Sequence, residues 1–272
     1  MESVKIRTAD GLELDCRFFG KAQKRKAAPK SGMVFIHGWK DDAGTERFAE
    51  VIAEKCEGED IGFLAFSNRG AGEKGATENF EDCILDIEAA VSFMEARGYG
   101  KAFLLGHSTG CQKAAYYWHK KRDGRVEGMA LLEPTDDAAL AKRELGERYG
   151  EAILLARKNG NRMMPGWAQV GGKISAARFL SMFSPDETEG GLFDFGGDLG
   201  ILGSLERDCL IIFGSKSAYN ENPKEKAKKL MWNMPSCQAL VEGGADHHFH
   251  EHEERLADIL ISWIKERGEF VA

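Results

Sequence analysis

The chain has 272 residues, of which 43% are hydrophobic and 30% are charged. This balance is that of an ordinary globular protein, and it excludes disordered and fibrous classes. The formal net charge of −7 opposes binding to a phosphate backbone or an anionic lipid surface, so we expect no nucleic-acid partner.

The cysteine pattern and the absence of long apolar runs bear on location. Six cysteines lie far apart, without any C-x-x-C pair, and we expect reduced, mostly buried thiols in a cytoplasmic protein. No apolar run approaches the roughly 20 residues that span a bilayer, so we expect no membrane span. A basic cluster between two predicted strands is interpreted as a solvated loop. It comprises Lys21, Lys24, Arg25, Lys26 and Lys30.

The first predicted element is a β-hairpin. Val4 and Ile6 alternate with charged residues, a T-A-D-G turn follows at 8–11, and apolar residues alternate again over 12–18. Six short, continuous apolar runs then indicate strands buried on both faces of a parallel sheet. They cover 33–36, 61–66, 102–105, 126–132, 209–213 and 239–241.

Segments with helical spacing lie between these strands. They cover 45–56, 77–96, 108–121, 223–232 and 251–266. This alternation predicts an α/β fold with a doubly wound, mostly parallel sheet, whose ligand crevice lies at the carboxyl ends of the strands.

About 70 residues separate the predicted sixth and seventh strands, where one crossover helix would suffice. An apolar stripe predicts a helix over 138–156, and a second helix is expected over 174–183. Glycine pairs at 190–191 and 196–197 indicate a loose, turning segment. We therefore expect one domain, 1–272, in which 138–206 forms an inserted helical cap.

The segment KAFLLGHSTGCQ, at 101–112, carries the strongest chemical signal, a G-x-S-x-G pattern between a predicted strand and a helix. A serine on such a tight turn exposes its Oγ, and side chains two residues to either side would collide with the turn, which explains Gly106 and Gly110. The helix N-terminus also favours a developing oxyanion. Ser108 is therefore the predicted nucleophile.

The predicted base lies in GGADHHF, at 243–249, between the last strand and the last helix. A histidine in this loop reaches a serine at the strand ends, and His247 is the candidate. Three further histidines, His248, His250 and His252, alternate with other residues without cysteine or spaced carboxylate ligands. We interpret them as a solvated helix start, and expect no metal and no cofactor.

A third motif, FIHGW at 35–39, ends a buried strand in a glycine-containing turn. With SNRGAG at 67–72, these motifs make nearly the whole chain resemble the α/β-hydrolase superfamily. More narrowly, GHSTGCQ at 106–112, VEGMALLEP at 126–134 and ISAARFL at 174–180 resemble an esterase-like branch that includes fungal siderophore esterases. The resemblance implies an α/β-hydrolase fold with a cap and a Ser/His/acid triad. It also implies an oxyanion hole formed by the backbone N–H groups of Trp39 and Thr109.

The acid departs from the superfamily pattern. It usually follows the seventh strand, where this chain has Ser217. In haloalkane dehalogenases the acid follows the sixth strand, and GMALLE at 128–133 resembles that strand end, so Glu133 is the predicted acid. A carboxylate there needs a buried partner, which His247 would supply. Asp136 and Asp137 are the alternatives, although a role in capping the next helix is open to both.

These features predict a serine esterase that cleaves a small or medium carboxylic ester through an acyl-enzyme at Ser108. One alternative is thioester or amide hydrolysis by the same triad. Because Ser217 stands at the usual acid position, a non-catalytic ligand-binding protein of the same fold is the other alternative.

Overall fold

The computed structural model describes residues 1–21 and 30–268. Lys24, Arg25 and Lys26 of the basic cluster therefore lie outside the described residues. None of the helices in the described part of the chain is long and apolar enough to cross a membrane.

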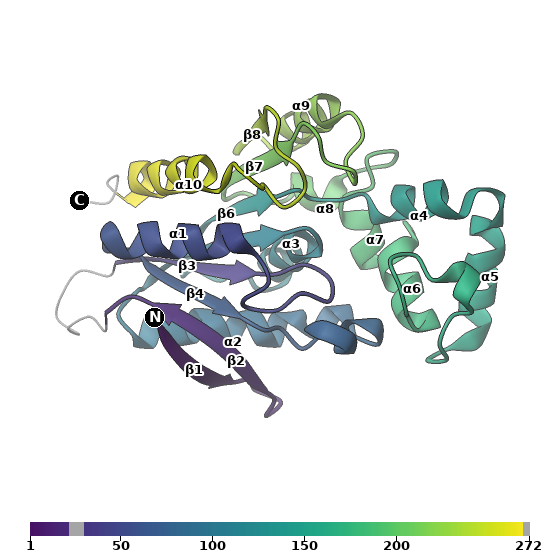
Figure 1. Ribbon diagram of the computed structural model, residues 1–272, viewed down its shortest axis with the longest axis horizontal. Coiled ribbons are helices and arrows are strands. Elements are labelled where there is room, and N and C mark those ends of the chain that lie inside the picture. The colour runs from purple at the N-terminus through teal and green to yellow at the C-terminus, as the bar shows by residue number, and fades with distance from the viewer. Residues whose placement is uncertain (22–29, 269–272) are drawn as a thin grey trace.

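An eight-stranded sheet forms the centre of the molecule, in the order β1-β2-β4-β3-β5-β6-β7-β8 (Figure 1). Strands β1 and β2 form the predicted antiparallel hairpin, β2 pairs antiparallel with β4, and the other pairs are parallel. The predicted mostly parallel sheet is confirmed. The strands are β1 (Glu2–Arg7), β2 (Glu13–Phe19), β3 (Ser31–Ile36), β4 (Gly62–Phe66), β5 (Lys101–His107), β6 (Val126–Leu132), β7 (Asp208–Gly214) and β8 (Cys237–Glu242).

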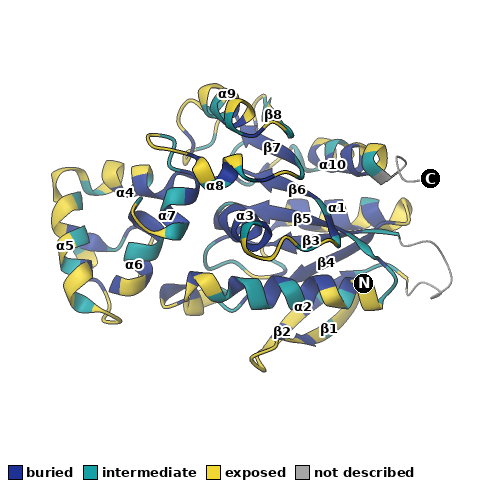
Figure 2. Ribbon diagram, turned by 180° about the vertical axis from the view of Figure 1, so that it is seen from behind, coloured by how far each residue is buried: buried dark blue, intermediate teal, exposed yellow. Residues whose placement is uncertain are grey.

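Helices cover both faces of the sheet, which leaves the central strands buried (Figure 2). Side chains alternate between the faces: Val34 and Ile36 pack with α2 and α3, whereas Met33 and Phe35 pack with α1 and α10. Continuous apolar runs follow because neither face meets water. The covering helices are α1 (Arg47–Gly58), α2 (Cys83–Ala96), α3 (Thr109–Lys121), α9 (Pro223–Asn233) and α10 (Glu253–Gly268).

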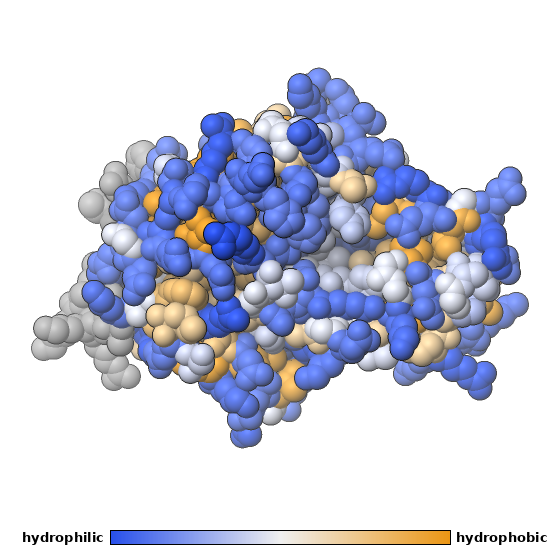
Figure 3. Space-filling view, viewed as in Figure 1, coloured by the Kyte–Doolittle hydropathy of each residue, from blue (hydrophilic) through white to orange (hydrophobic). Residues whose placement is uncertain are grey.

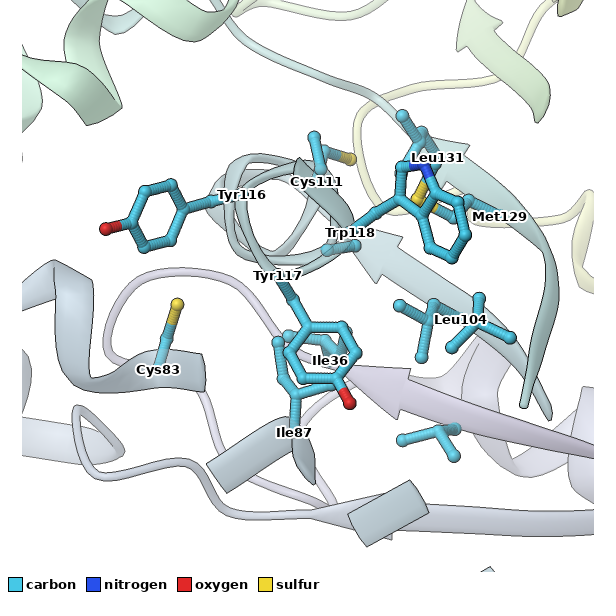
Figure 4. Close-up of a cluster of buried hydrophobic side chains, with 14 of the residues drawn as sticks. Ile36, Cys83, Ile87, Leu104, Cys111, Tyr116, Tyr117, Trp118, Met129 and Leu131 are labelled. Atoms are coloured by element: carbon cyan, nitrogen blue, oxygen red, sulfur yellow. The ribbon is translucent and has the colours of Figure 1, made fainter. Parts of the chain in front are cut away.

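The packing of α3 fixes the position of its N-terminus at the end of β5. Figure 4 shows Tyr117 of α3 beside Ile36 and Ile87, and Trp118 beside Met129 and Leu131 of β6. All of these side chains are buried. Because these contacts fix α3, they also fix the turn that joins β5 to α3.

Two expectations for regular elements are wrong. Strand β8 is not buried on both faces, because it is the edge strand of the sheet, and Leu240 is 42% exposed. The helix expected over 77–96 begins only at Cys83, after two 3-10 turns, Gly72–Ala76 and Phe80–Asp82.

The segment between β6 and β7 is helical and lies beyond the carboxyl ends of the parallel strands (Figure 1). It contains a buried apolar cluster of its own, which includes Ala152, Phe179 and Phe183. Its helices are α4 (Asp137–Leu145), α5 (Tyr149–Asn159), α6 (Ala176–Phe183), α7 (Thr188–Leu192) and α8 (Gly200–Gly203), with 3-10 turns at Gly146–Arg148 and Gly166–Ala168.

Two details of this segment differ from expectation. The single helix expected over 138–156 is broken at Gly146, whose φ is +54°, a value that ends α4. The glycine pair at 190–191 lies in α7 rather than in a loose loop. A Cβ on Gly190 would lie 2.2 Å from the carbonyl oxygen of Ser184, so this glycine permits close packing.

Candidate active site

Ser108 occupies a strained turn between β5 and α3, with φ +53° and ψ −126°. A positive φ is uncommon for a residue other than glycine, and it persists only where the surroundings enforce it. The two neighbouring glycines serve this turn. A Cβ on Gly110 would lie 2.0 Å from the carbonyl oxygen of Ile36, and a Cβ on Gly106 would lie 2.6 Å from that of Gly110.

The substitution Gly110→Ala is expected to lower the free energy of unfolding by about 1–3 kcal/mol, because the new methyl group overlaps backbone that cannot rotate away. Urea denaturation measures the change. The matched control is Gly124→Ala, since nothing lies within 4 Å of a Cβ at Gly124. Equal stabilities of the two variants would contradict the close packing of the turn.

A cavity of about 320 Å³ opens above Ser108. Trp39, Thr109 and His247 line it together with Ser108, so the predicted nucleophile, base and oxyanion residues share one cavity. Within the described ranges, the backbone N–H groups of Trp39 and Thr109 donate no hydrogen bond to the protein. The helical segment contributes Leu140, Val170, Met182 and Phe183 to the wall. On its outer face, the helical segment shows apolar side chains among hydrophilic ones (Figure 3).

Glu133 follows β6, is fully buried and lies behind His247. Its Oε2 is 3.0 Å from Nδ1 of His247 and accepts a hydrogen bond of 2.8 Å from Asn220 Nδ2. The Ser217 hydroxyl and the Gly214 backbone N–H also donate to this carboxylate. Burial alone would raise the pKa of Glu133, but the hydrogen bonds from His247 and Ser217 outweigh it and lower the pKa.

The alternative acids make their hydrogen bonds elsewhere. Asp136 caps α4, accepting from the backbone N–H of Ala139 at 2.8 Å and from that of Phe195 at 3.0 Å. Asp137 lines the cavity, where it accepts hydrogen bonds of 2.8 Å from Thr135 and Gln112. Burial raises the pKa of Asp137 to about 8. The structure therefore brings Glu133, and neither aspartate, to hydrogen-bond distance of His247.

The end of β7 and the loop after it supply donors to Glu133 that the sequence did not indicate. They are the Gly214 backbone N–H, the Ser217 hydroxyl and the Asn220 amide, although Ser217 was expected only as the residue at the usual acid position. These contacts follow from the pairing of β6 with β7, in which Leu132 lies opposite Ile212, so that the segments after the two strands meet. No sequence motif indicated them.

Contacts with His107 and Tyr219 hold the loop that carries His247. Nε2 of His107 lies 2.9 Å from the carbonyl oxygen of His247, and the Tyr219 ring packs against His247 with centroids 4.5 Å apart. The interpretation of His248 as solvated is wrong, because it is half-buried and its Nδ1 lies 3.0 Å from Oε1 of Glu46. His250 is exposed and pairs with Asp246.

A second cavity of about 420 Å³ adjoins the first, and the two share Leu140 and Tyr219. Charged side chains dominate its wall, among them Arg143, Glu221 and Lys226. Ser108 lines the smaller of these two cavities and not the larger one.

Comparison with known proteins identifies the family. Residues 33–259 match the sequence profile described as the alpha/beta hydrolase family, which is most of the chain. The chain belongs to the alpha/beta hydrolase family. This membership and the mostly parallel sheet confirm the fold that the resemblance implied, while the narrower siderophore-esterase branch stays a prediction.

Solved structures with the same fold include Est1E from Butyrivibrio proteoclasticus with bound ferulic acid, at 15% identity, covering 97% of this chain and 99% of that chain, with a TM-score of 0.74. A thermophilic esterase from Thermogutta terrifontis is 18% identical; the match covers 98% of this chain and 100% of that chain, with a TM-score of 0.61. The esterase RhEst1 from Rhodococcus sp. ECU1013 is 20% identical; the match covers 98% of this chain and 100% of that chain, with a TM-score of 0.60. No curated protein matches this alpha/beta hydrolase by sequence.

Proposed function

We propose that this alpha/beta hydrolase is a serine esterase that cleaves a small or medium carboxylic ester. Ser108 is the nucleophile, His247 the general base and Glu133 the acid that orients it. The backbone N–H groups of Trp39 and Thr109 hold the oxyanion.

The observation that carries the proposal is the 3.0 Å contact between Nδ1 of His247 and the buried Glu133 carboxylate. A serine at position 217 raises the question of whether the triad has an acid at all. Here the Ser217 hydroxyl donates to Glu133, and so it supports a carboxylate that comes from the neighbouring strand. A lowered pKa keeps Glu133 ionised at neutral pH, as stabilisation of an imidazolium requires.

The reaction has two halves. Ser108 Oγ attacks the ester carbonyl while His247 takes the serine proton, and the resulting oxyanion accepts hydrogen bonds from Trp39 and Thr109. His247 returns the proton to the leaving alcohol, which leaves an acyl-enzyme. Water, deprotonated by His247, then attacks the acyl-enzyme and releases the carboxylic acid with regeneration of Ser108.

The cavity supports the proposed substrate size. Its volume of about 320 Å³ and the side chains of Leu140, Met182 and Phe183 suit a short or medium acyl or alcohol portion. We assign residues 138–206 as a cap over the site, because this segment supplies those three side chains. Esterase structures of the same fold, one of them with ferulic acid bound, agree with an ester substrate.

A cytoplasmic location is part of the proposal. Among the described residues all six cysteines are free, and five of them are buried. Buried free thiols suit a reducing compartment.

The test is labelling with a fluorophosphonate probe, followed by hydrolysis of p-nitrophenyl esters from acetate to laurate. Wild-type protein is expected to be labelled, and Ser108→Ala is expected to lose the label. Ser262→Ala is the matched control, because Ser262 is an exposed serine of α10 and should leave labelling intact.

The ester series measures the size of the acyl pocket, with a preference for short or medium chains expected. Faster hydrolysis of thioester or amide substrates would replace the ester assignment while keeping the triad. Folded wild-type protein that takes no label would overturn the proposal in favour of a non-catalytic ligand-binding protein.

A further inference from the structure

Three residues from distant parts of the chain each bring one possible ligand atom into the same small volume. They are Glu46 before α1, His107 at the end of β5, and His248 in the loop before α10. The three atoms lie within 4.8 Å of one another. Oε1 of Glu46 is 3.0 Å from Nδ1 of His248 and 3.5 Å from Nδ1 of His107. Ligand atoms around a tetrahedral zinc ion are about 3.3–3.5 Å apart. We propose that Glu46, His107 and His248 bind one divalent transition-metal ion, represented by Zn²⁺.

The ring of His107 supplies the strongest support. Its Nε2 lies 2.9 Å from the carbonyl oxygen of His247, which only accepts hydrogen bonds, so Nε2 carries the proton. Nδ1 therefore presents a lone pair. It is fully buried, has no hydrogen-bond partner within the described ranges, and faces the Glu46 carboxylate. Oε1 of Glu46 also lies 3.0 Å from Nδ1 of His248, whereas the buried lone pair of His107 is left without a partner. A cation bound between the two electron-rich atoms would supply that partner.

A proton is the other cation that could occupy this position, carried by His107 or by His248, whose Nδ1 lies 3.0 Å from Oε1 of Glu46. A proton joins only two of the three atoms, whereas a metal ion uses the atoms of Glu46, His107 and His248 together.

The surroundings match those of known metal ligands. A histidine that binds a metal usually donates its second ring N–H to a carboxylate or a backbone carbonyl, as His107 does to His247. Two histidines and one carboxylate form a ligand set that suits zinc and leaves a position for water. The His248 side chain is 43% exposed, whereas the other two ligands are buried, so an ion enters from the His248 side.

Metal binding at this point would connect three elements that carry the candidate active site. The His107 and His248 rings flank His247, with centroid distances of 4.9 Å and 5.1 Å. An ion held by Glu46, His107 and His248 would join the start of α1 and the end of β5 to the His247 loop. It therefore orders this loop and stabilises the folded chain.

The test uses protein without a histidine tag, stripped with a chelator and then titrated with ZnCl₂. Equilibrium dialysis is expected to give one Zn²⁺ per chain, and the Tm is expected to rise by roughly 5–10 °C at a free concentration 100 times the Kd. Co²⁺ in place of Zn²⁺ is expected to give visible absorption bands. None of these readouts depends on esterase activity.

Variants locate the ion. Glu46→Gln and His248→Ala are each expected to weaken Zn²⁺ binding at least ~10-fold. His248→Ala keeps the test valid if the buried Glu46 variant fails to fold. The control is the double variant His250→Ala with His252→Ala, which removes the neighbouring histidines and should bind as wild type does. Absence of binding, or binding lost only in the control, would overturn the site.

Discussion

Replacing Glu133 by glutamine is expected to lower kcat for ester hydrolysis about 10³–10⁴-fold, with little change in KM. The carboxylate accepts from Nδ1 of His247 and does not line the cavity, so its loss affects proton transfer rather than substrate contact. A neutral amide cannot stabilise the imidazolium, and it can hold the ring in the wrong tautomer. The measurement is steady-state kinetics with the preferred p-nitrophenyl ester, and the rate of fluorophosphonate labelling should fall in parallel.

The control for this prediction is Asp136→Asn. Asparagine keeps the cap on the Ala139 N–H and loses only the second acceptor, which serves the Phe195 N–H. Because Asp136 does not line the cavity at Ser108, kcat should remain within a few-fold of wild type. Thermal denaturation of both variants excludes unfolding as the cause of a rate loss. A large loss in Asp136→Asn with an active Glu133→Gln would move the acid and reject Glu133.

The sequence predicted the strands that are buried on both faces, because burial on both sides demands a continuous apolar run. It failed for β8, where the edge position exposes side chains such as Leu240 although the run is apolar. The break at Gly146 was also missed, since the apolar stripe continues across it and only a backbone with positive φ marks the end of α4. Periodicity reports which face is buried, and not where a helix is interrupted.

For the candidate site, local motifs indicated Ser108 and His247, because a strained turn and a loop after the last strand have recognisable sequences. Contacts between distant segments had no such signal. Glu46 and His248 are 202 residues apart in sequence, and Asn220 is 87 residues from Glu133. Such pairs depend on sheet order and on how loops cross the strand ends, which a single sequence does not reveal.

A buried charge network joins the helical segment to the rest of the domain. Arg178 of α6 forms a bidentate pair with Glu189 of α7, with one distance of 2.8 Å. It also lies 3.5 Å from Glu78, which in turn is 2.6 Å from Nζ of Lys113 on α3. All four side chains are essentially inaccessible to water. Burial alone would raise the pKa of Glu78, but the nearby Lys113 and Arg178 charges lower it, so this carboxylate stays ionised.

The substitution Arg178→Met is expected to lower the free energy of unfolding by about 3–5 kcal/mol, since removal of one partner leaves buried carboxylates without their countercharge. Urea denaturation followed by circular dichroism measures the loss. Arg157→Met is the matched control: Arg157 pairs with Asp186 at side-chain exposures of 52% and 73%, and the change should be below about 1 kcal/mol.

The same experiment tests how the helical segment depends on the network. Because Arg178 connects α6 and α7 to Glu78 and, through it, to Lys113 of α3, its loss should weaken the attachment of the segment that lines the cavity with Met182 and Phe183. Activity is therefore expected to disappear at a lower urea concentration than the circular dichroism of the sheet. Loss of activity and of circular dichroism at the same urea concentration would show instead that the helical segment and the sheet unfold as one unit. A free energy of unfolding within 1 kcal/mol of wild type would contradict the role of Arg178 itself.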